Sequence, residues 1–167
     1  VALPPRIPAA RYTTLTLAAA RPGVPTRHPE TPGLAISERS MANERLEVTI
    51  EANGALTVLD KATGQVYSRL LTFEDRADIG DGWYHGLAVN DQTFISTAGR
   101  ADVALVHDGP FLTTFRIRTT LSVPAAFQFD RMARAEQFAD LVIDSLVSLR
   151  PGQDYVTIHT TVQNVVE

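Results

Sequence analysis

The chain has 167 residues, of which 44% are hydrophobic and 20% charged, which is enough to bury the core of one domain and excludes disorder throughout. Fifteen basic and nineteen acidic residues give a net charge of −4, and no basic stripe indicates a nucleic-acid partner. The absence of cysteine excludes disulfides, iron–sulfur clusters, thiolate zinc sites and a cysteine nucleophile. The apolar runs are too short to span a membrane.

The first 33 residues differ in composition from the rest of the chain. Residues 1–20 are predicted to be a strand segment from a preceding small β-domain, and residues 21–33 a linker rich in proline and glycine. Residues 34–167 are predicted to form a β-sandwich domain. Because the chain opens on valine and stops soon after a strand pattern, we expect a C-terminally truncated part of a larger protein. The compartment stays open, with the cytoplasm favoured because no signal-peptide pattern is visible.

Two hairpins are predicted at the start of the sandwich. Leu46, Val48 and Ile50 alternate with polar residues, as in a half-buried strand. Asn53-Gly54 follows and predicts a type I′ turn, in which both residues take positive φ, so residues 45–60 form one hairpin. Thr63-Gly64 is a second turn signal, and residues 66–72 follow it as another strand.

The remainder of the chain also has the pattern of many short strands. Further strands are expected at 83–89, 93–98, 101–107, 111–123, 140–149 and 154–165. Only residues 130–138 have helical composition, enough for one or two turns capped by Asp130. The sequence therefore predicts an all-β fold, an antiparallel β-sandwich.

The most unusual stretch is FEDRADIGDGWYHG, residues 73–86, which combines carboxylates, glycines and aromatic residues. Its carboxylates are compatible with a glycosidase pair, with calcium ligands, or with groups that bind sugar hydroxyls beside Trp83 as a stacking platform. A calcium loop starting at Asp75 fails, because Ala77 and Ile79 stand where oxygen ligands are required. The structural alternative is a solvated acidic turn whose aspartates bind their own backbone amides.

Other catalytic and metal motifs are missing from the sequence. It has no His-Glu-x-x-His motif, no Gly-x-Ser-x-Gly elbow and no phosphate-binding Gly-x-x-x-x-Gly-Lys loop. A zinc site made of His85, Asp78 and Asp81 is geometrically possible but lacks ligand spacing, so we predict no metal ligands and no catalytic residues in this chain. Arg116 and Arg118 share one face of a strand, where we expect them to face solvent or pair with acids rather than bind an anion.

Five segments, in order, resemble the C-terminal β-region of glycoside hydrolase family 38, the α-mannosidase family. They are a proline-containing segment and strand, a hairpin with Asn-Gly and Asp-Lys-x-x-Gly turns, an Asp-x-Gly-Asp-x-Tyr loop, a Gly-Pro strand and a late strand ending in asparagine. In this sequence they occupy residues 1–17, 45–65, 70–85, 107–124 and 149–164. Trp83 stands where the family usually has tyrosine.

The resemblance implies a sandwich similar to that of galactose mutarotase, within a larger multidomain enzyme. It implies that the nucleophilic aspartate, the acid/base carboxylate and a zinc ion belong to an N-terminal catalytic barrel outside this sequence. The sandwich would pack on that barrel and contribute a loop to the mannoside site, with Asp78, Asp81, Trp83 and Tyr84 as substrate-binding residues. The chain alone is then expected to hold no stoichiometric zinc and to hydrolyse no α-mannoside.

Two other functions are compatible with the sequence. Trp83 and Tyr84 can serve as stacking groups of an independent carbohydrate-binding module. The domain can also be purely structural or mediate oligomerisation. A homodimer through an exposed strand edge, such as residues 154–165, is part of this expectation.

Overall fold

The computed structural model describes residues 9, 12, 14, 16 and 32–166. Most of the predicted strand segment at 1–20 and nearly all of the linker at 21–33 lie outside the described residues. In the described part, the strands are β1 (Ala35–Ser37), β2 (Ser40–Ala42), β3 (Leu46–Ile50), β4 (Leu56–Asp60), β5 (Val66–Leu70), β6 (Glu74–Asp75), β7 (Phe94–Ile95), β8 (Ala101–Gly109), β9 (Leu112–Pro124), β10 (Phe127–Gln128), β11 (Ala133–Arg134), β12 (Phe138–Leu149) and β13 (Thr157–Gln163).

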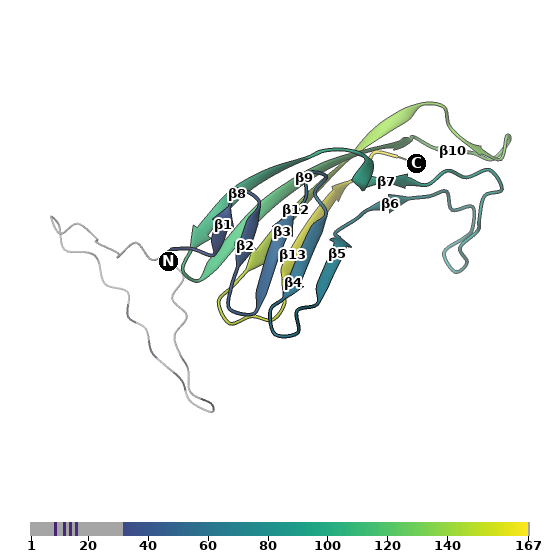
Figure 1. Ribbon diagram of the computed structural model, residues 1–167. Coiled ribbons are helices and arrows are strands. Elements are labelled where there is room, and N and C mark those ends of the chain that lie inside the picture. The colour runs from purple at the N-terminus through teal and green to yellow at the C-terminus, as the bar shows by residue number, and fades with distance from the viewer. Residues whose placement is uncertain (1–8, 10–11, 13, 15, 17–31, 167) are drawn as a thin grey trace.

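Two antiparallel sheets form the body of the molecule, as the all-β prediction required. One has the order β1-β2-β3-β4-β5 and the other the order β13-β12-β9-β8. Figure 1 shows the two sheets as facing layers. Two short ribbons, β6-β7 and β10-β11, extend from one end of these layers (Figure 1).

Alternating burial along the strands produces the main core between the layers. In β3, Leu46, Val48 and Ile50 point inward, while Glu47 and Thr49 lie at the partly exposed face. They pack with inward residues of the opposite sheet, including Phe115 and Ile117 of β9 and Val147 and Leu149 of β12. Each fully buried side chain of this kind contributes about 1.5–3 kcal/mol, so the period-2 pattern determines which face of each strand lies inside.

A second core extends β9 and β12 toward the end that carries the short ribbons. Leu121 and Val123 of β9 pack against Leu141 and Ile143 of β12. Phe73 and Phe94, which flank the β6–β7 loop, pack on this cluster. The loop therefore starts and ends on a hydrophobic base.

The hairpin predicted at 45–60 is confirmed, but its type I′ turn is wrong. Gly54 has a φ of 88°, whereas Asn53 is not among the residues with positive φ. The Gly54 N–H donates to the Glu51 carbonyl, and Glu51 in turn donates to the Ala55 carbonyl, which closes a three-residue loop. Such loops need only one left-handed residue, so Gly54 alone meets the requirement.

The helix expected at 130–138 is also wrong. Ala133 and Arg134 pair with Gln128 and Phe127 in an antiparallel ribbon, and Met132 turns the chain with a φ of 49°. The Arg134 side chain forms an ion pair with Asp75, which is distant in the sequence. This tertiary contact outweighs the helical propensity of the segment. The one helical element described is a 3₁₀ turn, η1 (Ser96–Ala98), and no described helix could cross a membrane.

Buried Asn43 connects two turns at the other end of the sandwich. Its side-chain Nδ2 donates to the carbonyls of Arg150 and Gln153, at 2.7 and 2.9 Å. Its Oδ1 accepts from the backbone N–H groups of Arg45 and Leu46, at 2.8 and 2.7 Å. All four hydrogen-bonding positions of the amide are used, as burial of a polar group requires.

Candidate functional site

The predicted site residues lie on the long loop between β6 and β7, which projects from the end of the sandwich (Figure 1). The strand expected at 83–89 is wrong, because these residues form the returning half of this loop. An isolated bridge pairs Asp78 with Leu87, and the Ile79 N–H donates to the Gly86 carbonyl at 3.0 Å. The loop is therefore a narrow, hydrogen-bonded projection.

Asp78 connects the outgoing and the returning half of the β6–β7 loop. Its Oδ1 accepts from the backbone N–H groups of Gly80 and Gly86, at 2.9 and 2.8 Å. Its Oδ2 lies 3.0 Å from Nδ1 of His85. The Gly80 N–H, followed by the Gly86 N–H and the His85 side chain, lowers the pKa of Asp78 to about 2. This carboxylate is therefore ionised at neutral pH, and three groups of its own loop surround it.

Asp81 organises the tip. Its Oδ1 accepts from the backbone N–H groups of Trp83 and Tyr84, at 2.9 and 3.0 Å, and its own N–H donates to the Tyr84 carbonyl. Among the described residues, no donor contacts its second oxygen, Oδ2. The turn leaves residue Trp83 96% exposed and Tyr84 71% exposed. The tip thus presents one carboxylate oxygen beside two uncovered aromatic rings.

Two glycines allow this tight geometry. A Cβ on Gly80 would lie 1.7 Å from the Tyr84 carbonyl oxygen, and one on Gly86 would lie 2.6 Å from the Gly80 nitrogen. Side chains are thereby excluded at both positions. The third glycine, Gly82, has open space around it and is not required by sterics.

A partly buried ion cluster clamps the base of the loop. Nη2 of Arg134 lies 2.5 Å from Oδ2 of Asp75, which precedes the loop, and Nη1 lies 3.5 Å from Oδ1 of Asp91, which follows the loop tip. Asp91 also accepts from the Ala77 N–H at 3.0 Å. The guanidinium packs 5.5 Å from the ring centroid of Phe94. Sequence analysis missed this clamp, because nothing in the local pattern connects Arg134 to either aspartate.

Arg116 and Arg118 lie on the outer face of the four-stranded sheet and pair with Asp144, as expected for acid-paired arginines. Nε of Arg116 donates to Oδ1 of Asp144 at 2.7 Å, and Nη2 of Arg118 donates to Oδ2 at 3.0 Å. Hydrogen bonding to Arg116, with a smaller contribution from Arg118, lowers the pKa of Asp144 to about 2 despite opposing desolvation.

Asp78 and Asp81 are engaged by groups of their own loop, while the two aromatic residues at its tip are exposed. Both aspartates bind backbone amides, so the structural alternative describes their contacts correctly, while Trp83 and Tyr84 remain uncovered. Asp78 and His85 lie together, but Asp81 is engaged at the tip. No group of three or more histidine, aspartate or glutamate side chains in the described part of the chain is placed to hold a metal ion. Among the described residues, His85, Asp78 and Asp81 are not gathered into such a group.

Comparisons with known proteins agree with the resemblance seen in the sequence. No protein-family model matches the chain. The chain is 27% identical to the "Putative mannosylglycerate hydrolase" of Halalkalibacterium halodurans, over 77% of this chain and 16% of that protein. It matches the crystal structure of a glycosyl hydrolase family 38 protein from Enterococcus faecalis with a TM-score of 0.79 and 27% identity, covering 85% of this chain and 19% of that one. An α-mannosidase structure from Enterococcus faecalis V583 matches with a TM-score of 0.76 and 27% identity, over 80% and 17%.

These comparisons confirm the predicted similarity to a region of glycoside hydrolase family 38 enzymes. The chain spans less than a fifth of the length of each of these relatives.

Proposed function

From this similarity to glycoside hydrolase family 38, we propose that the chain is the non-catalytic β-sandwich part of an α-mannosidase-like enzyme. It packs on a catalytic domain and supplies the β6–β7 loop to that domain's mannoside site. In this proposal the two catalytic carboxylates and the zinc ion belong to the catalytic domain. Residues of this chain bind and orient the sugar.

The observation that supports this role is the exposed aromatic pair held on a fixed turn. Asp81 fixes the backbone of Trp83 and Tyr84, so this stretch of main chain does not have to be ordered when a ligand arrives. A flat apolar ring packs well against the C–H face of a pyranose. Oδ2 of Asp81, beside the rings, can accept a hydrogen bond from a sugar hydroxyl.

The enzyme that carries this sandwich provides the test. Asp81→Asn keeps an oxygen for the Trp83 and Tyr84 amides but removes the charge offered to the sugar. We expect a ten- to hundredfold loss in kcat/KM on an aryl α-mannoside, equivalent to about 1.5–3 kcal/mol for a charged hydrogen bond. The melting temperature should stay nearly unchanged. Val89→Ala, at an exposed side chain of the same loop, is the matched control.

Unchanged kinetics in Asp81→Asn would remove the tip from the sugar site. Normal kinetics at low temperature with a large loss of stability would instead assign Asp81 a purely structural role. Turnover of the aryl α-mannoside by this chain alone, above a buffer blank, would contradict its assignment as non-catalytic.

A second candidate function is an independent carbohydrate-binding module. The exposure of both Trp83 and Tyr84 on the chain itself favours it. A module binds sugar without a catalytic domain, whereas a contributed loop binds only when that domain completes the site. Sugar titrations of this chain with and without the catalytic domain distinguish the two functions.

A further inference from the structure

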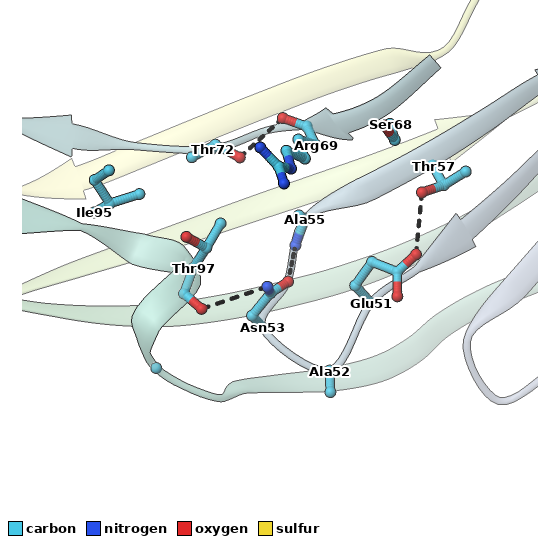
Figure 2. A pocket seen from close by; sticks show the side chains of 11 residues that line it. Glu51, Ala52, Asn53, Ala55, Thr57, Ser68, Arg69, Thr72, Ile95 and Thr97 are labelled. Carbon is cyan, nitrogen blue, oxygen red and sulfur yellow. Dashed lines mark hydrogen bonds between the residues drawn. The ribbon is translucent and has the colours of Figure 1, made fainter. Parts of the chain in front are cut away.

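An open cavity of about 770 Å³ with a mixed polar and apolar lining lies on the sandwich, away from the projecting tip. It is bounded by the β3–β4 turn, by β5 with the segment that follows it, and by the η1 turn. Figure 2 shows these walls and the polar side chains that line them. The volume is within the range typical of small-molecule sites.

Arg69 enters this cavity from a strained backbone. Thr57 of β4 faces two residues of β5, Ser68 and Arg69, which makes a β-bulge in the pairing. Arg69 has a φ of 59° and Leu71 a φ of 57°, and they are two of the three non-glycine residues with positive φ in the described part of the chain. Bulges next to functional sites redirect side chains, and strain in non-glycine residues concentrates at such sites. Figure 2 shows the guanidinium turned into the space bounded by Thr72, Ala55 and Asn53.

Several other polar side chains of the cavity are held by hydrogen bonds. Thr57 donates to Oε1 of Glu51 at 3.0 Å, and Thr72 donates to the Arg69 carbonyl at 2.8 Å. Asn53 accepts from the Ala55 N–H at 3.0 Å, which fixes its side chain. No described carboxylate lies within ion-pair distance of the Arg69 guanidinium. Its donors and the second oxygen of Glu51 therefore remain open to a ligand.

The charge and lining of the cavity indicate the chemistry of that ligand. Among the described residues that line it, only Arg69 and Glu51 are charged, so this lining is neutral overall while it offers both strong donors and strong acceptors. Thr57, Ser68, Thr72 and Thr97 add hydroxyl groups, and Gly99 and two alanines leave room for a ring. A neutral polyhydroxylated molecule matches this set, because adjacent hydroxyls donate to a carboxylate and accept from a guanidinium.

We propose that this cavity is a second carbohydrate-binding site, in which Arg69 and Glu51 hydrogen-bond hydroxyls of a neutral sugar. It is separate from the β6–β7 loop and needs no catalytic domain. A glycine at the bulge would relieve the backbone strain but would lose the guanidinium.

The test is an NMR titration of the isotopically labelled chain with methyl α-mannopyranoside and with an α-linked mannobiose. We expect saturable shifts of the amides at 51–57 and 68–72. Arg69→Gly should weaken binding about ten- to a hundredfold while the melting temperature stays unchanged or rises, since glycine accepts the left-handed backbone. Arg131→Ala, at an exposed arginine outside the cavity, should bind as the unaltered chain does.

Glu51→Gln provides a second variant that keeps the acceptor for Thr57 and should also weaken binding. The proposal would be overturned by an absence of saturable shifts in the cavity, or by Arg69→Gly and Glu51→Gln variants that bind the sugar as tightly as the unaltered chain. Shifts confined to residues 78–86 would support the loop and reject the cavity. Shifts confined to the cavity would support this site even if the loop proves to bind nothing.

Discussion

Arg134 and Asp75 are 59 positions apart in the sequence, and Nη2 of the arginine lies 2.5 Å from Oδ2 of the aspartate. The same guanidinium faces Asp91, so one side chain joins the start and the end of the β6–β7 loop. Only 12% of the Arg134 side chain is exposed, and at such sites an ion pair is screened less than at the surface. The position of Trp83 and Tyr84 thus depends on a residue outside their own loop.

Replacing Arg134 with methionine should loosen the loop without removing the sandwich. Asp75 and Asp91 would lose their charged donor in a partly buried place, at a cost of about 1–3 kcal/mol in the free energy of unfolding. Urea denaturation followed by circular dichroism measures this loss. Arg131→Met, in the same β10–β11 turn but exposed, should change stability by less than about 0.5 kcal/mol. Equal effects of the two substitutions would contradict the clamp.

Trp83→Ala should weaken sugar binding and leave the stability of the fold unchanged. The ring is almost fully exposed, so its removal should leave the melting temperature within error. If it stacks on a sugar, the lost aromatic contact amounts to about 0.5–1.5 kcal/mol, or roughly two- to tenfold in KM of the enzyme that carries this sandwich. Trp83→Phe should recover most of that loss. Failure of phenylalanine to recover more than alanine would argue against stacking.

Acid should destabilise the fold in part through Asp144. The pKa of this group is lowered from 3.8 to about 2 by its pairing with Arg116 and, less strongly, Arg118. A lowered pKa means that the folded state binds the proton more weakly than the unfolded chain. The stabilisation is therefore complete above about pH 5 and is lost as the pH falls from about 4 toward 2.

Stability measured by urea denaturation at a series of pH values tests this expectation. Between about pH 4 and pH 2, the free energy of unfolding should fall less steeply with decreasing pH in Asp144→Asn than in the unaltered chain. The reason is that the asparagine side chain cannot take up the proton. Asp130→Asn, in an exposed turn, serves as the control. If the free energy of unfolding fell equally with decreasing pH in Asp144→Asn and in the unaltered chain, Asp144 would not contribute to acid destabilisation.

Self-association through β13 is expected at high protein concentration. β13 is an outermost strand of its sheet, and Ile158 and Val162 are 42% and 49% exposed. Exposed strand edges with apolar side chains pair readily with other chains. Light scattering should show dimers that Ile158→Lys abolishes and Val89→Lys, on the distant loop, does not. A monomer at every concentration would reject this edge as an interface.

The sequence was most informative where burial alternates along a strand. In β3, and in β12 from Leu141 on, every second residue is buried, so hydrophobic periodicity located these strands and their inner faces. The strand at β9 was predicted from its β-branched and aromatic composition, and its burial alternates from Phe115 to Val123. The same rule placed Arg116 and Arg118 on one outer face. Periodicity is reliable there because a one-residue shift would expose the whole core face.

The sequence pattern gave a wrong prediction where side chains, instead of backbone carbonyls, accept the hydrogen bonds of backbone N–H groups. Residues 83–89 have strand composition, but Asp78 and Asp81 bind the amides of Gly86, Trp83 and Tyr84 and fold the segment into a loop. The aspartates were recognised as important from composition, whereas their partners were not. Arg134 escaped prediction because its contacts depend on how two distant segments pack.

The long strands β9 and β12 pass through both hydrophobic cores, since each contributes residues to the first and to the second cluster. Their ladder is continuous, with Leu141 paired to Leu121 near one end and Val147 to Phe115 near the other. Unfolding of either core alone would therefore break part of a continuous ladder whose other part is still packed in the intact core. Amide protons at the centre of this ladder should exchange with solvent only when the whole sandwich unfolds, while those of the β6–β7 projection exchange through local opening.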